Sequence, residues 1–197
     1  MHFYKNIRTL DPLVEDLAKV TYSKDMFDTT GREKMYRENL DLNLSFLNQE
    51  AKEYIDSIVK KHIKLANYSF SVIESSSNCN VHKDAHEHKE RKYQRYANLA
   101  IPLVGDMTNR YTIWPNLTEE DTKFVNTRGF LTKEASQKYY ELSKAKAHYR
   151  HKLHTPVLLN TEEPHTVICD SYSLFVYITL VGVPFKTSEL LFGQLAK

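Results

Sequence analysis

His82 and Asp84 are the residues of this chain best suited to bind a metal ion, and a single lysine separates them. Side chains two positions apart on an extended backbone point to the same side of the strand. An imidazole nitrogen and a carboxylate oxygen can therefore reach one ion from these positions. Because His-x-Asp is a common tripeptide, two solvated loop residues would have the same pattern. The hypothesis therefore needs a third ligand from elsewhere in the chain.

His165 is the best candidate for the third ligand. It stands where the turn 162–164 gives way to an apolar run at 166–168 that is typical of a strand. Two imidazoles and one carboxylate occupy one face of an octahedral ion and leave three positions open. Non-haem Fe(II) oxygenases use this arrangement to bind a co-substrate and O2. His82, Asp84 and His165 are therefore candidates for an Fe(II) site, and spacing alone leaves the interpretation as solvated loop residues open.

Other histidines leave an alternative open. His86 and His88 continue the alternation that begins at His82, so a local Zn(II) site that includes Asp84 is conceivable. The residues that follow are strongly charged, which favours a solvated loop instead. Three more histidines lie in a basic stretch and are expected at the surface: His148, His151 and His154.

The elements that must position these ligands are short strands preceded by helices. Asp11 as N-cap and Pro12 in the first turn indicate a helix that extends to about Val20. An apolar stripe predicts a longer helix from about 48 to 66, with Asn67 as a left-handed stop. The β-like runs are 68–74, 79–84, 96–104, 110–114, 156–160, 165–169 and 174–181. This order predicts a mainly β fold with helices (α+β), either a β-sandwich or a jelly roll, with a helical buttress.

Residues from about 116 to 154 interrupt the strand pattern and have helical spacing. Their excess of lysine and arginine, interleaved with tyrosines, would suit a nucleic-acid or acidic-partner surface. We favour the simpler interpretation of helices whose tyrosines pack on the sheets. A lid over the metal-binding end is a third interpretation, since an insertion of this length between strands is commonly functional.

Length and composition indicate one domain of ordinary character. The 197 residues, 41% of them hydrophobic, divide into a helical buttress at 1–67, a β core at 68–181 and a C-terminal tail at 182–197. No apolar run is long enough for a membrane span, and the first residues lack the pattern of a secretory signal. Two cysteines cannot build a disulfide framework, which favours a reducing cytoplasm.

Three blocks of sequence widen the context of the metal prediction. They are 80–84 (NVHKD), 98–103 (NLAIPL) and 156–167 (PVLLNTEEPHTV). In residue type, order and spacing they resemble the 2-oxoglutarate/Fe(II)-dependent oxygenase superfamily, particularly its small bacterial and phage-encoded members. The resemblance spans about residues 68–181 and does not account for the insertion. It implies a cupin-like double-stranded β-helix in which His82, Asp84 and His165 bind the iron.

The chain departs from this family where the co-substrate should be held. Most members carry an arginine about nine or ten residues after the distal histidine, and this arginine pairs with the far carboxylate of 2-oxoglutarate. Here those positions are Leu174 and Phe175, and no cation occurs between His165 and Lys186.

The resemblance therefore implies a cation from another strand. Arg110, at the start of a β-like run, is the first candidate, and Arg95 is the second. Asn98, in the second block, is expected as a further contact to the co-substrate. For Arg110 alone, an exposed residue at a strand end is an equally simple interpretation.

Two functions follow from these observations. The first is a dioxygenase that uses Fe(II) and 2-oxoglutarate to hydroxylate a small molecule or polypeptide that the sequence does not identify. The second is a degenerate, non-catalytic β-helix that binds a metal or a ligand, and the missing arginine after His165 supports it.

Overall fold

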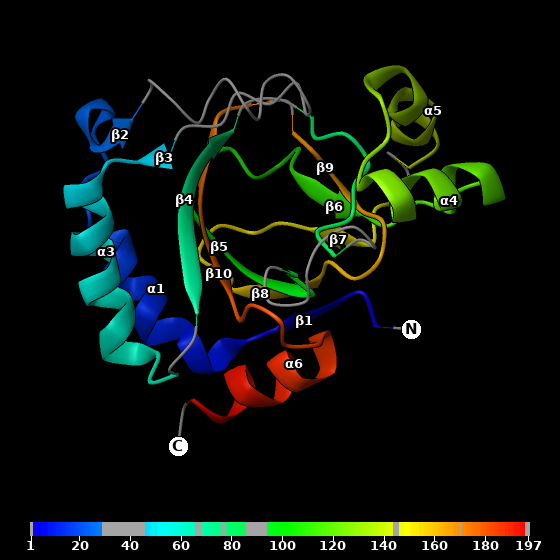
Figure 1. Cartoon of the computed structure of the whole chain (residues 1–197). Coiled ribbons are helices and arrows are strands. Elements are labelled where there is room, and N and C mark those ends of the chain that lie inside the picture. Colours follow the sequence, from blue (N-terminus) through cyan, green and yellow to red (C-terminus); the bar gives the residue numbers. More distant parts are fainter. Residues whose placement is uncertain are drawn as a thin grey trace.

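Two antiparallel β-sheets form the centre of the molecule, and helices cover the outer side of the larger one (Figure 1). The structure is a computed structural model that describes residues 2–28, 46–65, 68–75, 78–85, 94–143, 146–169 and 171–195. The expected α+β class with antiparallel strands is confirmed.

The larger sheet has five strands in an order that differs from the sequence order. The strands are β1 (Tyr4–Asn6), β8 (Val157–Asn160), β5 (Ala97–Gly105), β10 (Ser173–Thr179) and β4 (Ser69–Ser75), as neighbours in that order. The long strands β5 and β10 lie at its centre, with Val176 opposite Ile101 and Ile178 opposite Leu99. Fully buried β-branched and leucine residues at these positions explain why this pair forms the middle of the sheet.

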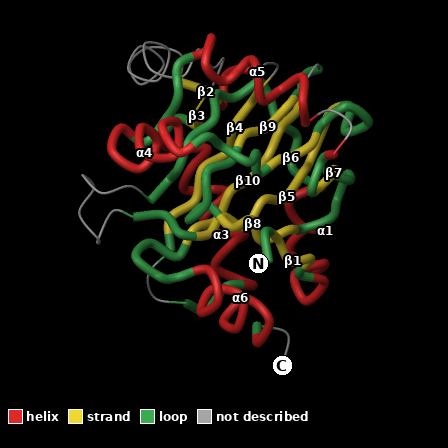
Figure 2. The backbone as a smooth tube through the Cα atoms, turned by 90° about the vertical axis from the view of Figure 1, so that its right-hand side faces the viewer, coloured by secondary structure: helices red, strands yellow, loops and turns green. Residues whose placement is uncertain are grey.

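The smaller sheet has three strands, in the order β7 (Tyr149–Arg150), β6 (Tyr111–Ile113) and β9 (Thr166–Ile168). The segment 78–84, here called the His82 segment, runs beside β9 and donates a hydrogen bond from Cys79 N to Val167 O at 2.9 Å. It pairs as an isolated bridge at His82, so the prediction of a continuous strand over 79–84 was too long. Figure 2 shows the two sheets from the side.

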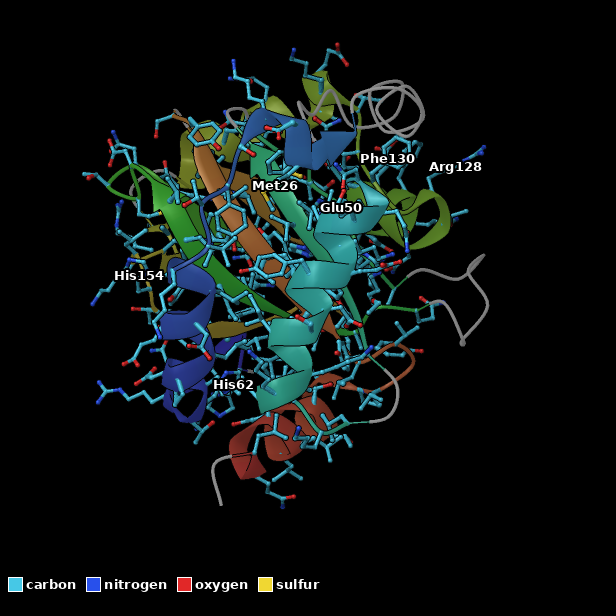
Figure 3. All side chains as sticks on the ribbon, turned by 90° about the vertical axis from the view of Figure 1, so that its left-hand side faces the viewer. Met26, Glu50, His62, Arg128, Phe130 and His154 are labelled. Atoms are coloured by element: carbon cyan, nitrogen blue, oxygen red, sulfur yellow. The ribbon has the colours of Figure 1, made fainter. Side chains whose placement is uncertain are left out.

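Two N-terminal helices, α1 (Asp11–Ala18) and α3 (Gln49–His62), pack on the larger sheet side by side (Figure 3). The predicted start of α3 is confirmed, because the Asn48 side chain accepts a hydrogen bond from Ala51 N at 2.9 Å. The predicted N-cap Asp11 is wrong: Leu10 is the N-cap and Asp11 is already helical. Asn67, the predicted helix stop, lies outside the described residues.

The predicted buttress contains more than helices. β1 adds an edge strand to the larger sheet, with Lys5 opposite Leu158. Short strands β2 (Phe27–Asp28) and β3 (Phe46–Leu47) pair with each other, and two 3-10 turns, Arg8–Leu10 and Lys24–Met26, complete this region.

In the part of the chain that the structure describes, no helix has the length and apolar character needed to cross a membrane.

The insertion folds into α4 (Glu119–Arg128) and α5 (Lys133–Ser143) and returns to the smaller sheet through β7. Its link between the helices runs beside the His82 segment: Lys83 N donates to Gly129 O at 2.7 Å, and Leu131 N donates to Val81 O at 2.8 Å. Tyr139 and Tyr140 are both buried. The burial of these tyrosines agrees with the interpretation of helices that pack on the sheets.

The last described residues form a third covering helix, α6 (Phe185–Gln194), so the word tail was wrong for this segment. Phe192 on this helix is fully buried in the main core, and its carbonyl accepts a hydrogen bond from Thr9 Oγ1 at 3.1 Å. The C-terminal helix thereby connects to the turn that precedes α1.

Replacing Phe192 with alanine should lower the free energy of unfolding by about 3–5 kcal/mol, because a large buried ring is lost and a cavity remains. Leu190→Ala on the same helix is the matched control, since Leu190 is 65% exposed and should change stability by about 0.5 kcal/mol or less. Urea denaturation measures both values. Equal losses in the two variants would show that α6 does not depend on this packing.

Candidate functional site

His82 and His165 meet across the edge of the smaller sheet. Their backbones exchange two hydrogen bonds, each of 2.9 Å, and their imidazole rings lie 4.4 Å apart between centroids. Directly opposed residues of an antiparallel pair place their side chains on one face of the sheet. His82 is partly buried and His165 is 4% exposed. Two histidines that are 83 residues apart in the sequence (165 − 82) therefore form one cluster.

Asp84 completes the cluster from the same segment as His82. Its Oδ1 lies 3.8 Å from His82 Nε2. The three predicted ligands thus converge, but they are not a closed cage: no group of three or more His, Cys, Asp or Glu side chains in the described ranges has the geometry to hold an ion as it stands. Metal binding here requires side-chain adjustments, and the backbone bridge already holds two of the three groups together.

Backbone carbonyls orient both imidazoles. His82 Nδ1 is 2.8 Å from Asn80 O, and His165 Nδ1 is 3.0 Å from Glu163 O. A carbonyl oxygen can only accept, so each Nδ1 must carry the hydrogen. In a neutral ring this leaves the lone pair on Nε2. Outer hydrogen bonds of this kind fix the tautomer and orientation of metal-binding histidines.

Asn98 holds the carboxylate in a similar way. Its Nδ2 donates to Asp84 Oδ2 at 2.6 Å, while its Oδ1 accepts from the Thr179 hydroxyl. The carboxylate fixes which end of the amide faces it, since an ionised carboxylate can only accept, and the Asn98 oxygen is then left to accept from Thr179. Asn98 was expected to contact the co-substrate; the structure shows its amide engaged with a predicted ligand, across the space between the sheets.

The cluster is electrostatically coupled. Burial lowers the pKa of His165 to about 4, and the neighbouring His82 acts in the same direction. Burial also acts to lower the pKa of His82, but the Cys79 sulfur and the Asp84 carboxylate outweigh it and raise this pKa to about 10. One imidazolium therefore faces one carboxylate. A metal ion that binds through His82 Nε2 must displace this proton.

Arg110, predicted to anchor the co-substrate, is 3% exposed, so the interpretation as an exposed residue at a strand end was wrong. Its Nη1 donates to Cys169 Sγ at 3.1 Å and to Ser173 Oγ, and its guanidinium carbon lies 4.1 Å above the Phe175 ring. Its Nε has no hydrogen-bond partner in the described structure. Within the described ranges these contacts include no carboxylate, so the charge of this buried guanidinium is not neutralised by an ion pair.

Tyr177 lies within electrostatic range of both halves of the site. Burial raises the pKa of its phenol, while the nearby Arg110 guanidinium acts to lower it and the Asp84 carboxylate to raise it. The ring stacks on Phe175 at 5.7 Å between centroids. Tyr177 on β10 therefore makes a side-chain hydrogen bond with Arg110 and interacts electrostatically with the Asp84 carboxylate of the candidate metal cluster.

His151 is the residue that sequence reasoning missed, because it was expected at the surface and is 3% exposed. Its basic surroundings in the sequence concealed a strand continuation: His151 N donates to Arg110 O at 3.0 Å, next to the last residue pair of β6 and β7. Burial holds the pKa of His151 well below its usual value, and Arg110 adds to this shift. The available signal in the sequence was the alternation of the charged Arg150 with the aromatic rings of Tyr149 and His151, which is typical of a strand with one buried face.

The other candidates are placed as follows. Arg95 is only partly buried, and its carbonyl accepts from Thr161 Oγ1 at 2.8 Å. His148 and His154 are exposed, as expected. His86 and His88, the additional ligands of the alternative Zn(II) site, lie outside the described residues.

Comparison with models of protein families and with curated proteins found no match to this chain.

The buried neutral state of His151 predicts a pH dependence of stability. In the unfolded chain His151 binds a proton as the pH falls below about 6.5, whereas in the folded protein it stays neutral. The free energy of unfolding is therefore highest above this pH and decreases below it, by up to about 1.4 kcal/mol per pH unit. Urea denaturation between about pH 7.5 and 5.5 should show a shallower decline for His151→Phe than for the wild type. The other histidines titrate in both proteins and cancel in the difference. Parallel curves would contradict the neutral buried imidazole.

Proposed function

We propose that this protein is an Fe(II)- and 2-oxoglutarate-dependent dioxygenase that hydroxylates its substrate. The observation that carries the proposal is the convergence of His82, Asp84 and His165, with both imidazoles held through Nδ1 by backbone carbonyls. Two imidazoles and one carboxylate are the donor set that Fe(II) oxygenases use. When bound, Fe(II) and 2-oxoglutarate supply the chemistry that activates O2 and couples oxidative decarboxylation to hydroxylation of a C–H bond.

The strand order supports the double-stranded β-helix that the proposal requires. From β4 onward the chain visits the larger sheet, the smaller sheet through the His82 segment, the larger again through β5 and the smaller through β6. After the insertion the alternation starts from the smaller sheet: β7 and β9 lie in the smaller sheet, and β8 and β10 lie in the larger one. Eight segments divided equally between two facing sheets are the expected topology of a jelly roll.

In the proposed site, the groups around the three ligands hold them in position. The backbone carbonyls of Asn80 and Glu163 keep the two imidazoles directed at the ion, and Asn98 restrains Asp84 through Oδ2. Oδ1 then faces His82 as the ligand oxygen. Because a metal ion must take the place of any proton on the ligand edge of His82, metal binding should release that proton and should weaken at low pH.

Arg110 supplies the cation that the strand after His165 lacks. A buried guanidinium is costly unless its charge is matched, and in the described structure it meets a thiol, the hydroxyls of Ser173 and Tyr177, and an aromatic ring. A carboxylate would match both its charge and its donor geometry. Its neighbour Tyr177 hydrogen-bonds to Arg110 and interacts electrostatically with Asp84, so a short dicarboxylate could extend from the iron to Arg110 beside this phenol.

The first test is metal binding. The purified protein should bind one Fe(II), or Mn(II) as an inert surrogate, measured by calorimetry. His82→Ala, Asp84→Ala and His165→Ala should each weaken binding strongly because each removes a ligand, while His148→Ala should have no effect. If His86→Ala and His88→Ala abolish binding and His165→Ala does not, the local Zn(II) site replaces this one.

The second test concerns the co-substrate. Anaerobic addition of 2-oxoglutarate to the Fe(II) protein should produce a visible charge-transfer band, and Arg110→Ala should raise the concentration required by about tenfold to a thousandfold, or roughly 1.4–4 kcal/mol. Fe(II) affinity should be unchanged, because Arg110 is not a metal ligand. Arg95→Ala is the matched control. Absence of the band at millimolar 2-oxoglutarate in the wild type would favour the degenerate, non-catalytic β-helix.

The substrate class is a small molecule or a polypeptide. The insertion is a candidate for recognising a nucleic acid, but its tyrosines are used for packing, and we do not favour this role.

Both cysteines are free, which fits a reducing compartment such as the cytoplasm.

A further inference from the structure

The inner face of the β6–β7 pair carries three buried polar atoms without hydrogen-bond partners in the described structure: Arg110 Nε, His151 Nδ1 and Tyr149 Oη. Buried polar atoms are nearly always paired, so several unpaired atoms on one surface point to a missing ligand. The strand register explains why they gather. Thr112 lies opposite Tyr149, and the next inward pair along the ladder is Arg110 with His151, joined by the hydrogen bond from His151 N to Arg110 O.

The opposite face of this ribbon confirms the alternation. Arg150 lies opposite Tyr111, and its guanidinium lies 5.0 Å from the centre of that ring, away from the inner residues. Side chains alternate between the two faces of a strand, so Arg110 and His151 share the inner face and are close neighbours. Both contact Phe175 on the facing sheet: Arg110 lies over its ring, and His151 meets it edge-on at 5.2 Å between centroids.

The His151 ring is held in a single orientation. Its Nε2 lies 2.7 Å from Thr112 Oγ1, and Tyr149 packs against it at 5.0 Å between ring centroids. When the Thr112 hydroxyl donates to Nε2, the imidazole hydrogen is on Nδ1, where it has no acceptor among the described residues. The neutral ring then offers one N–H donor directly beside a buried cation.

We propose that Arg110 and His151 together form a carboxylate-binding site on the inner face of the smaller sheet, in which His151 donates through Nδ1. The inference rests on the proposed function and deepens it, because it assigns the site to the far carboxylate of a 2-oxo dicarboxylic acid. His151 contributes a donor without a second positive charge. The site therefore selects for an acid with a carboxylate at its far end over a 2-oxo acid of equal length that ends in a methyl group.

The experiment compares two such acids on the full-length Mn(II)-loaded protein. The probes are 2-oxoglutarate and 2-oxopentanoate, which share the metal-binding end and differ at the far carbon, and calorimetry gives both dissociation constants. His151→Phe keeps the aromatic packing but removes the donor. It should weaken 2-oxoglutarate binding by about tenfold to a hundredfold, the loss expected for a hydrogen bond to a charged group, and leave 2-oxopentanoate unchanged.

His148→Phe is the matched control, since it makes the same substitution three positions away at an exposed residue, and it should change neither constant. His151→Gln keeps an amide donor and should recover part of the lost affinity. If His151→Phe does not fold, imidazole ¹⁵N spectra of the wild type loaded with diamagnetic Zn(II) decide the question. The Nδ1–H signal that is absent from His151→Gln should shift with 2-oxoglutarate and stay in place with 2-oxopentanoate.

The outcomes separate the two proposals. If the wild type binds neither acid, the dioxygenase proposal fails. If the wild type prefers 2-oxoglutarate and a folded His151→Phe binds it equally well, the dioxygenase stands and the role of His151 is wrong. The same conclusion follows if the variant weakens both acids to the same extent, because His151 would then act on the shape of the pocket and not on the far carboxylate.

Discussion

The backbone bridge between His82 and His165 is the interaction on which the candidate site depends. Two hydrogen bonds of 2.9 Å join segments from opposite ends of the β core and place both imidazoles on one face. The bridge also sets the register of Cys79 beside Val167, so a slip of one residue would turn both histidines away from each other. The link of the insertion, at Phe130, pairs with His82 from the other side and supports the same segment.

A second constraint is the buried charge of Arg110. Removing a guanidinium from water costs several kcal/mol unless other groups compensate, and in the described structure the compensation comes from a thiol, the hydroxyls of Ser173 and Tyr177, and the face of Phe175. The same charge helps to keep His151 neutral. The interior of the two sheets is thus divided into a candidate metal end, which contains the Asp84 carboxylate, and a cationic end, where His151 is neutral, and Tyr177 interacts with both.

At each of these two ends, a residue of one sheet is held by residues of the other sheet. At the metal end, Asp84 of the His82 segment is restrained by Asn98 on β5, which Thr179 on β10 orients. At the other end, Arg110 beside β6 donates to Ser173 at the start of β10. The Ser173 end of β10 therefore holds a residue of the opposite sheet directly, and the Thr179 end does so through Asn98. The distance between the sheets and the positions of the functional groups are consequently set together.

Local sequence was sufficient for the elements and for the polar candidates. The stripe from Ala51 to Ile63 and the cap at Asn48 determine α3, and alternation determines most strands, because these signals act over a few residues. His82, Asp84 and His165 were predicted from type and spacing together with the family resemblance, and Arg110 from the cation that the resemblance implies. The pattern did not identify His151, since a histidine among basic residues has the local signature of a solvated loop.

Tertiary structure alone decided which of these groups meet. Whether Arg110 is buried depends on β10, more than 60 residues later, and the burial of His151 depends on its pairing with Arg110 across the insertion. Asn98 shows the same limit: its motif marked it as important, but its partner Asp84 was set by the contact between two sheets. The physical reason is that burial and pairing are properties of long-range register. A difference of one residue in that register reverses the face of every side chain while it leaves the local pattern unchanged.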